Sequence, residues 1–471
     1  MSELPTGWAE ASVGDVAVDV RSGFASGRHN ADAIGIPHLR PMNVSRNGEI
    51  DLTEVKYVAA DAGDRRLSFG DVLFNNTNSP ALVGKTAAYL SQENVAFSNH
   101  MTRIRLHYGM DPPFVARQLH QLWASGGLSH LVSNHVNQAS IAGSRLAADV
   151  RIRVAPTAEQ ERIVAAIEEA FSKLDAGEAG LRIVRQLLKR MRDAVLAAAI
   201  MGRLVAQDPA DTPATKLLAD LGVEPRTGAE LPDGWSWTTV GDLLTRIEAG
   251  KSFASLGRPA EPHELGVVKV SAMTWGEFRS EENKAIPPGA TIDPRWVIRR
   301  DDLLFSRANT SEYVGACVVV PCDYPNLILS DKSLRLVPCD GVSSSWLLSY
   351  LRARPARAQM ESLATGTKES MRNISQEKLR NIEVALPPTE EQDRVAQEIA
   401  RQHSFLDACE RAVDTGLARS QAFRRSVLKA AFEGKLAPQD PSDEPASALL
   451  ERIRSDGVAV PKRFQRTRRT G

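Results

Sequence analysis

The chain repeats itself, and this repeat constrains its fold more than any other feature. The segment Leu4–Trp8 recurs as Leu231–Trp235. The segment Pro156–Arg162 recurs as Pro388–Arg394, and from there the second copy keeps the same offset without a gap through Pro441. Self-similarity on this scale is typical of a chain that is built from structural copies. We therefore expect two similar units related by a pseudo-two-fold internal repeat.

The two parts of each copy repeat with different strictness. The region after Pro156 repeats in gap-free register, whereas the region before it repeats only at framework points such as Val13–Asp15 and Val240–Asp242. Variable loops on a constant scaffold are typical of proteins that bind different targets. Two copies arranged head to tail can close into a ring only if the second long helix returns to the first domain.

Each strictly repeated region predicts one long helix. The spans Thr157–Gln160 and Thr389–Gln392 fit the capping box, in which a hydroxyl and an amide satisfy free backbone N–H groups. Gly202 and Gly434 occupy positions where a left-handed residue would end each helix. At about 1.5 Å per residue, some 45 residues make a rod of roughly 65–70 Å.

Apolar residues in these two regions follow the alternating four-and-three spacing of a heptad. Such a seam is buried when two helices pack along each other, so the pattern predicts a coiled coil of the two helices, and the family resemblance described below implies that they are antiparallel. The expected seam residues are Ile163, Ile167, Leu174, Leu181, Val184, Leu188, Val395, Ile399, Leu406, Val413, Phe423 and Val427.

The regions between the helices predict mixed α+β domains, with strands first and helices later. The expected strands are Asp71–Phe74, Thr86–Leu90, Gly266–Val270 and Val314–Val320, and the expected shorter helices are Phe114–Trp123 and Ser345–Leu351. The expected order is a globular domain at 1–155, a long helix at 156–203, a linker at 204–230, a second globular domain at 231–387, a second long helix at 388–435, and a C-terminal segment with a basic tail at 436–471.

Composition narrows the class of protein only slightly. Lys plus Arg equals Asp plus Glu at 58 each, so net charge gives no indication of a nucleic-acid partner. The 4 cysteines have no metal-site spacing, and we expect them to be reduced core residues. No apolar run approaches the ~20 residues of a membrane span, and the first residues do not resemble a secretory signal. We therefore expect a cytoplasmic protein without a metal site.

One motif has the form of a catalytic site. Asp111–Phe114 resembles the D-P-P-[YF] motif with which amino-methyltransferases hold a flipped base. No glycine-rich turn that could bind S-adenosylmethionine precedes it, and its repeat counterpart, Asp340–Trp346, lacks the motif. We predict that Asp111 caps a helix and that the chain has no catalytic residues. Two alternatives stay open: a self-sufficient DNA amino-methyltransferase, and a coiled-coil scaffold with no DNA role.

Several segments together resemble one family, the DNA-specificity subunits of type I restriction-modification systems. These segments are Leu231–Asp242, Asp302–Arg307 with Val314–Gly315, Thr365–Lys368, and Ile382–Gln392. The last is the most diagnostic and occurs in both halves. The first domain departs from the pattern, because Asn137–Ser140 stands where the second domain has Thr365–Lys368.

The resemblance implies a non-catalytic subunit with two target-recognition domains. Each domain would recognise one half of a split, asymmetric site in double-stranded DNA, and the helix pair would fix the distance between the half-sites. Half-sites on one face of the duplex are centred about one turn apart, roughly 10 bp. The implied partners are two modification subunits, which carry S-adenosylmethionine and methylate adenine, and ATP-dependent restriction subunits. No cofactor is expected in this chain.

Candidate DNA-binding residues are polar or cationic loop residues, whose side chains suit base edges and phosphates. In the second domain they are Lys269, Ser271, Arg307, Asn309, Lys332, Lys368 and Arg372. In the first domain, alignment of the two repeats selects Arg40, Asn76, Asn78, Asn99 and His100, with Lys85 and Arg145 as neighbours.

Overall fold

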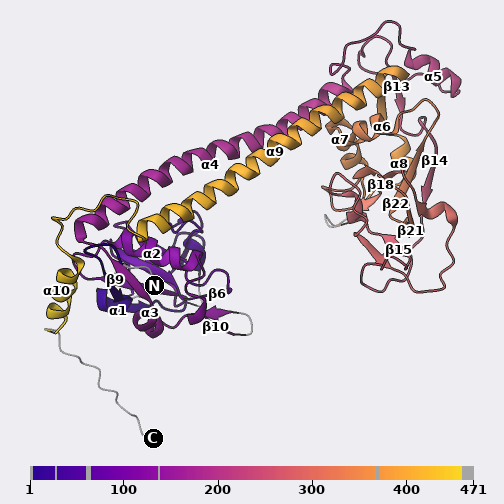
Figure 1. The fold of residues 1–471 in the computed structure, drawn as a ribbon. Coiled ribbons are helices and arrows are strands. Elements are labelled where there is room, and N and C mark those ends of the chain that lie inside the picture. Colours follow the sequence, from indigo (N-terminus) through magenta and orange to yellow (C-terminus); the bar gives the residue numbers. More distant parts are fainter. Residues whose placement is uncertain (1–3, 27–28, 60–64, 136–137, 367–370, 459–471) are drawn as a thin grey trace. The chain divides into compact units, whose positions relative to one another are not determined.

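The computed structural model covers residues 1–471 and describes residues 4–26, 29–59, 65–135, 138–366 and 371–458 (Figure 1). The chain divides into two compact units, each considered by itself. Unit 1 comprises Met1–Leu181 and Thr415–Gly471, and unit 2 comprises Arg182–Asp414. Among the described residues, no helix is both long enough and apolar enough to cross a bilayer.

Two long helices, α4 (Thr157–Ile200) and α9 (Thr389–Phe432), contribute to both units. The other elements of unit 1 are β1 (Ala9–Ser12), α1 (Val13–Val16), β2 (Ala17–Ser22), β3 (Ile36–Leu39), η1 (Pro41–Asn43), β4 (Lys56–Val58), β5 (Asp71–Asn75), β6 (Thr77–Asn78), β7 (Thr86–Tyr89), β8 (Ala96–Phe97), β9 (Met101–Leu106), α2 (Pro112–Ala124), η2 (Ser129–Leu131), β10 (Ser133–Asn134), β11 (Ala139–Ser140), α3 (Gly143–Asp149), β12 (Arg151–Val154) and α10 (Ala446–Val458). Those of unit 2 are α5 (Ala214–Asp220), β13 (Ser236–Thr239), β14 (Leu244–Ala249), β15 (Gly266–Val268), η3 (Val270–Met273), β16 (Asn283–Ala285), η4 (Pro294–Trp296), β17 (Val297–Ile298), β18 (Leu303–Ser306), β19 (Ala308–Asn309), β20 (Cys317–Val319), β21 (Tyr324–Ile328), β22 (Ser333–Pro338), α6 (Ser344–Arg352), α7 (Arg354–Leu363), β23 (Arg372–Asn373), α8 (Gln376–Arg380) and β24 (Glu383–Leu386).

The same sheets occur in both units. The antiparallel sheet β2-β9-β5-β7 of unit 1 corresponds to β14-β22-β18-β20 of unit 2, and the pair β1-β12 corresponds to β13-β24. The first strand of each four-stranded sheet even carries a register shift at the same place, between Ala17 and Asp19 and between Leu244 and Arg246. Each unit thus mixes helices with largely antiparallel sheets, as the sequence predicts.

The predicted short elements agree well with the structure. The strands expected near Asp71, Thr86 and Gly266 are β5, β7 and β15, and the two expected helices are α2 and α6. The strand expected at Val314–Val320 is confined to β20, because Gly315 has a φ of +81° and forms part of the preceding turn.

The capping boxes predicted at the start of α4 and α9 are wrong. Thr157 is the first residue of α4, and its hydroxyl donates to the Gly109 carbonyl at 3.1 Å. The buried Gln160 side chain accepts from the Asp111 backbone N–H at 2.9 Å and donates to the Ala155 carbonyl at 2.8 Å. These tertiary partners take the side-chain groups that a capping box would use.

In unit 2, the counterpart of Gln160 makes the equivalent hydrogen bonds. Gln392 is buried, accepts from the Ser343 backbone N–H at 2.8 Å and donates to the Pro387 carbonyl at 3.4 Å. In both units it therefore joins the start of the long helix to the start of the helix that follows the four-stranded sheet. This role explains why the segment from Pro388 to Gln392 repeats so strictly.

A buried hydrogen bond holds the start of each long helix. The Trp8 indole N–H donates to Glu159 Oε2 at 3.0 Å, and the Trp235 indole N–H donates to Glu391 Oε2 at 2.9 Å. Burial raises the pKa of Glu159, as it does that of Glu391. We call each tryptophan–glutamate pair a helix anchor.

The end of a long helix packs on the helix anchor in each unit. In unit 1, Gly434 follows α9 with a φ of +68°, and a Cβ there would lie 2.5 Å from Pro5. In unit 2, Gly202 follows α4 with a φ of +63°, and a Cβ there would lie 2.5 Å from Pro232. The predicted left-handed ends are thus confirmed, and the close approach of proline explains the need for glycine.

The segment that follows each helix end closes the unit. Gln439 donates to Glu159 at 3.5 Å, and Arg162 forms an ion pair with Asp443 at 2.5 Å. In unit 2, Gln207 donates to Glu391 at 2.8 Å, and Arg394 pairs with Asp211. The core of unit 1 accordingly includes the end of α9 and part of α10, whereas the core of unit 2 includes the end of α4 and part of α5.

Ion pairs join α4 and α9 within each unit. In unit 1, Arg424 bonds Asp175 at 2.6 Å and Glu178 at 3.3 Å. In unit 2, its repeat counterpart Arg192 bonds Glu410 at 3.0 Å and also Asp407, and Arg185 bonds Asp414. Residue numbers rise along one helix as they fall along the other, so the paired segments run in opposite directions.

The seam between the helices differs from the predicted one in its middle part. Eight expected seam residues are buried, namely Ile163, Ile167, Leu188, Val395, Ile399, Leu406, Val413 and Val427, and Leu174 and Leu181 are half-buried. Val184 and Phe423, however, are 41% and 55% exposed, which corrects their placement. The neighbouring Arg185 and Arg424 bond acids of the other helix instead, and of the two only the Arg424 side chain is buried.

Replacing Trp8 with Phe tests the helix anchor. The variant leaves the buried Glu159 carboxylate without its indole donor, and we expect a loss of about 1–3 kcal/mol in the free energy of unfolding. Trp237→Phe is the matched control, since the Trp237 indole donates to the exposed Ala229 carbonyl. Urea unfolding of both variants measures the difference, and equal losses would contradict an anchoring role.

Candidate nucleic-acid interface

Candidate residues of unit 2 gather where the ends of several strands meet. The Arg307 backbone N–H donates to the Lys332 carbonyl at 3.0 Å, and the Ile374 N–H donates to the Arg307 carbonyl at 2.9 Å. In the ladder between β19 and β23, Asn309 faces Arg372. Four candidates that are distant in sequence are therefore neighbours. Lys368 lies outside the described residues.

Two further candidates share a cavity with Lys332. Lys269 and Ser271 line this cavity of about 440 Å³ together with Lys284. Within it, Lys269 Nζ pairs with Glu282 at 2.6 Å, and the Ser271 hydroxyl donates to the same carboxylate at 2.6 Å. These two bonds lower the pKa of Glu282. We call the surface formed by Lys269, Ser271, Arg307, Asn309, Lys332 and Arg372 the polar edge of unit 2.

The arginines of this edge differ in their freedom to bind a ligand. Arg372 donates to the carbonyls of Gly366 and Ala364, at 3.2 and 3.0 Å, so it holds the adjoining turn. Among the described residues, the side chain of Arg307 makes one long contact, from its Nε to Asn373 Oδ1 at 3.4 Å. A guanidinium held at one end can place its other N–H groups on two acceptors of a guanine. Arg307 is thus the better candidate for base recognition.

The candidates of unit 1 occupy the corresponding edge. The Asn76 backbone N–H donates to the His100 carbonyl at 3.0 Å, and the ladder between β6 and β11 pairs Asn78 with Ala139. Arg40 directly follows β3, whose Leu39 carbonyl accepts from Ser98, next to Asn99. Arg40, Asn78, Asn99 and His100 form the polar edge of unit 1.

Three predicted residues of unit 1 have structural partners instead. The Asn76 amide is buried and donates to Ser22, Thr102 and the Asn99 carbonyl. Lys85 is also buried, and its ammonium donates to the Val44 carbonyl. Arg145 bonds Asp149 at 3.2 Å and the Leu131 carbonyl at 3.2 Å. The buried side chains of Asn76 and Lys85 therefore stabilise the loops of the edge and do not form part of its surface.

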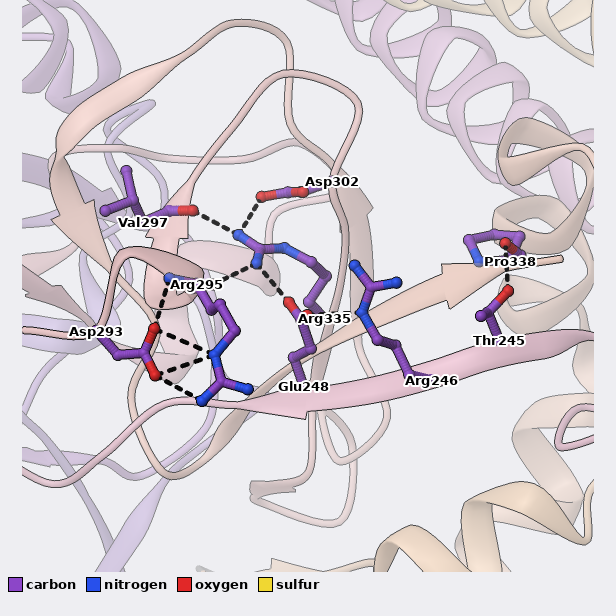
Figure 2. Close-up of polar contacts among 9 residues, drawn as sticks. All are labelled: Thr245, Arg246, Glu248, Asp293, Arg295, Val297, Asp302, Arg335 and Pro338. Carbon is purple, nitrogen blue, oxygen red and sulfur yellow. Dashed lines mark hydrogen bonds and ion pairs between the residues drawn. The ribbon is translucent and has the colours of Figure 1, made fainter. Parts of the chain in front are cut away.

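A buried arginine supports the edge of unit 2. Figure 2 shows Arg335 between Glu248 and Asp302, which its guanidinium bonds at 2.7 and 2.6 Å. It also donates to the carbonyls of Arg295 and Val297. These bonds satisfy a charge that would be costly to bury alone. Because Asp302 directly precedes β18, the network fixes the strand that leads to the polar edge.

Unit 1 also has a buried arginine with an acidic partner in the first strand of the sheet, but the acid and the base of that strand have exchanged positions. Its counterpart Arg103 is buried and pairs with Asp19 at 2.5 Å, and Arg21 binds the other oxygen of that carboxylate at 3.4 Å. In unit 2 the order along the strand is reversed, with Arg246 first and Glu248 two residues later. The sheet thus keeps its buried charge pair although the residues that supply it have changed places.

The methyltransferase-like motif is built into the core. The Asp111 side chain accepts from the Phe114 backbone N–H at 2.7 Å and caps α2, as predicted. The Phe114 ring is fully buried and packs edge-on against Trp8 and Phe432, with centroids 6.1 and 5.4 Å away. A ring enclosed in this way has no face on which a flipped base could stack.

Sequence reasoning missed Glu282 and Lys284 at the polar edge of unit 2. In β16 the side chains of Asn283 and Ala285 are buried, so Lys284 between them faces outward. This alternation was a usable signal for Lys284. For Glu282 there was none, because its role depends on the tertiary contact with Lys269.

The fold and the site define a protein with two similar α+β units, each with a polar edge of amide, imidazole or cationic side chains. No protein-family model matches the chain. The chain is 24% identical over 478 residues to the EcoKI type I restriction enzyme specificity subunit of Escherichia coli K12, covering 97% of both. It is 30% identical over 269 residues to the EcoEI specificity subunit of Escherichia coli, but that match covers 52% of this chain and only 44% of the relative.

A solved structure agrees in fold. A chain from a study of complex assembly and conformational transition in the type I R-M system superposes with a TM-score of 0.64 at 20% identity, covering 92% of this chain and 100% of that chain. At this identity the likeness concerns the fold alone. The sequence matches make this chain similar to type I restriction enzyme specificity subunits, and the match to the EcoKI subunit extends over nearly the whole of both chains.

Glu282→Gln tests the electrostatics of the polar edge of unit 2. Removal of the carboxylate releases Lys269 for a phosphate, and one added phosphate contact strengthens non-specific DNA binding by up to about tenfold at 0.1 M salt. Glu264→Gln is the matched control, since Glu264 pairs with Arg258 away from this cavity. Equal changes in a salt titration of both variants would show a general charge effect and contradict the prediction.

Proposed function

We propose that the chain is the sequence-specific DNA-binding subunit that directs the methyltransferase and nuclease subunits of a type I restriction-modification enzyme to a bipartite, asymmetric DNA site. The observation that carries this proposal is the repeated polar edge. Its framework is the same in both units, but Lys332 stands in unit 2 where unit 1 has His100, and Arg307 stands where unit 1 has the buried Asn76. The same scaffold with different side chains suits two different half-sequences.

In this proposal residues 1–155 and 231–387 are the two target-recognition domains, and residues 156–203 and 388–435 are the spacer helices of an antiparallel coiled coil. Residues 204–230 and 436–471 are the linker and the C-terminal segment. The ion pairs between α4 and α9 support one fixed register of the helices. A fixed register suits a spacer that holds half-sites about one turn, roughly 10 bp, apart. We place the protein with its DNA in the cytoplasm.

The proposed partners are two modification methyltransferase subunits, with ATP-dependent restriction subunits added in the nuclease. The S-adenosylmethionine would be bound by the modification subunits. Ile183, Leu187 and Met191 are exposed along one face of α4 in unit 2. Apolar residues at this spacing are typical of a helix face that packs on another protein. We propose that this stripe contacts a modification subunit.

The two alternative functions have weaker support. The methyltransferase alternative needs an accessible Phe114, and that ring is enclosed by Trp8 and Phe432. The scaffold alternative gives no reason for the different side chains at equivalent positions of the two polar edges. Neither alternative is favoured by a specific contact in the described residues.

Expression of the chain with and without its neighbouring methyltransferase gene separates the three functions. We expect a split adenine-methylation motif in sequenced DNA only when both proteins are present, because the chain selects the site and the partner transfers the methyl group. Methylation by the chain alone would support the methyltransferase alternative. Absence of any motif with the partner present would contradict the proposal.

Arg307→Ala tests whether the polar edge of unit 2 recognises bases. One lost bidentate contact to a guanine costs about 1–3 kcal/mol, or roughly 5- to 150-fold in affinity. We expect this loss only for duplexes that carry the second half-sequence, with the first half of the methylation motif unchanged. The same loss on unrelated DNA would argue against a role in base recognition.

Leu187→Glu with Met191→Glu tests the proposed stripe. Two charges on the apolar face should weaken association with the modification subunit at least about tenfold, because they would be buried unpaired in the interface. Lys189→Glu, at another exposed position of the same helix, is the control for charge alone. Size-exclusion chromatography of the co-expressed proteins measures the association, and intact complexes with the double variant would exclude this surface.

A further inference from the structure

Unit 1 contains a cationic cavity that the proposed base recognition does not use. This cavity of about 300 Å³ lies where the last turns of α9 meet α2 and the loop after η1. Arg46, Arg424, Arg425 and Gln421 line it, with Trp123 and Phe171 as aromatic walls. None of the described residues that line it is acidic.

Arg424 has one part of its guanidinium without a partner. Its Nη2 bonds Asp175 at 2.6 Å, its Nε bonds Glu178 at 3.3 Å, and its guanidinium carbon lies 4.9 Å from the centre of the Phe171 ring. The side chain is only 5% exposed, yet Nη1 has no hydrogen-bond partner in the described part of the chain. A buried N–H group without an acceptor is rare in folded proteins, so this group is available to an acceptor from outside the protein.

The other cations of the cavity lack counter-charges. In the described structure Arg46 and Arg425 form no ion pair. Burial lowers the pKa of the nearby Lys85, and the charge of Arg46 lowers it further. Burial also lowers the pKa of His120 to about 4, so this wall residue is neutral at physiological pH. Among the described residues, the charges of Arg46 and Arg425 therefore remain without an acidic partner.

Comparison of the two repeats shows which residues of this cavity serve helix packing and which do not. Arg192, the counterpart of Arg424, keeps the same two acidic partners on the other helix, Asp407 and Glu410. At the position of Arg425, however, unit 2 has Asp193. The arginine with its acids thus serves helix packing in both units. The added positive charge of Arg425 occurs in unit 1 alone and is not needed for that packing.

Two loops of unit 1 lead from the polar edge to the cavity. Arg46 lies in the loop that follows η1, and the residue that precedes η1 is Arg40. Ala81, whose carbonyl accepts from the Trp123 indole at 3.2 Å, lies in the loop that follows β6, which contains Asn78. Both loops thus carry a candidate base-contacting residue before they reach the cavity. A duplex on the polar edge would bring its backbone close to these arginines.

We propose that the cavity formed by Arg46, Arg424 and Arg425 binds a phosphate-type oxyanion, and that a backbone phosphate of the target DNA supplies it. This inference rests on the proposed function. Guanidinium groups bind phosphate oxygens through charge-assisted, often bidentate, hydrogen bonds. Such a contact adds affinity and fixes the position of the domain on the duplex without selecting a base. The free Nη1 of Arg424 would receive its missing acceptor.

The first experiment measures DNA binding by the complex of the full chain with its methyltransferase subunit over a series of salt concentrations. Replacement of Arg425 with Ala should remove one phosphate contact. The negative slope of log K against log salt should then become shallower by about 0.9, and the affinity should fall by roughly tenfold at 0.1 M salt. The methylation motif should stay unchanged. Arg425→Asp, which installs the residue of unit 2, should weaken binding further.

Arg419→Ala is the matched control, because Arg419 is exposed on the same helix but does not line the cavity. An unchanged salt slope for Arg425→Ala, or an equal fall for Arg419→Ala, would overturn the assignment to a DNA phosphate. A wild-type complex that produces no split methylation motif would instead refute the proposed function. The two failures are therefore distinguishable.

The second experiment identifies the source of the oxyanion. Inorganic phosphate should raise the thermal unfolding temperature of the wild-type chain more than that of Arg425→Ala, with equal concentrations of chloride as the reference. A phosphate effect combined with an unchanged DNA salt slope would assign the cavity to a free oxyanion and reject DNA as its source. No difference in either experiment would overturn the site altogether.

Discussion

The hydrogen bond from a buried indole to a buried glutamate is the contact on which the architecture of each unit depends. Glu159 and Glu391 lie in the first turn of a long helix, and the tryptophans that bind them come from the segment before the first strand of each unit. Each carboxylate also accepts from a glutamine, Gln439 or Gln207, that follows the end of the other long helix. Three segments that are distant in sequence thus meet at one acceptor.

This contact explains why unit 1 needs both ends of the chain. Its core combines Trp8 and β1 with the end of α9 and with α10, so residues from both ends of the chain pack together. Unit 2 obtains the same arrangement from the segment between Ile200 and Trp235. The head-to-tail repeat could be predicted from the sequence. Within each unit, the packing of a helix end follows from the glycine, proline and tryptophan that meet there.

The sequence predicted the elements better than the contacts of individual side chains. Hydrophobic periodicity located both long helices and most of the seam, because burial of apolar surface sets that pattern. It failed at Val184 and Phe423, where Arg185 and Arg424 face the other helix and bond its acids. Hydrophobic periodicity treats every charged residue as a surface residue. It therefore cannot identify a position between the helices where an arginine pairs with an acid of the other helix. The capping boxes failed for a related reason, since Gln160 was free in the pattern but has tertiary partners in the fold.

The same limit applies to the polar edges. Alignment of the two repeats selected candidates at equivalent strand ends, because the sheets repeat with the same order and the same register shift. It could not separate Asn76, whose amide is consumed by three internal hydrogen bonds, from Asn78 beside it on the edge. A polar side chain is available to a ligand only if the fold leaves its hydrogen-bonding groups free. That property belongs to the tertiary structure and has no local signature.

The exchanged positions of acid and base next to the polar edges show that the buried ion pair of the sheet can be kept while the sequence around it changes. Arg103 and Arg335 keep the same place in the sheet, although their partners are arranged as Asp19–Arg21 in one unit and as Arg246–Glu248 in the other. The acid that pairs with the buried arginine can stand at either of two positions of the first strand, which are two residues apart. Both orders of acid and base therefore satisfy the buried charge. Support of the sheet is thereby independent of the residues at its edge. Under the proposed function, substitutions at Arg307 or Lys332 would change what the edge binds, while the ladder between β18 and β22, which runs through Leu303–Ser306, is formed by other residues.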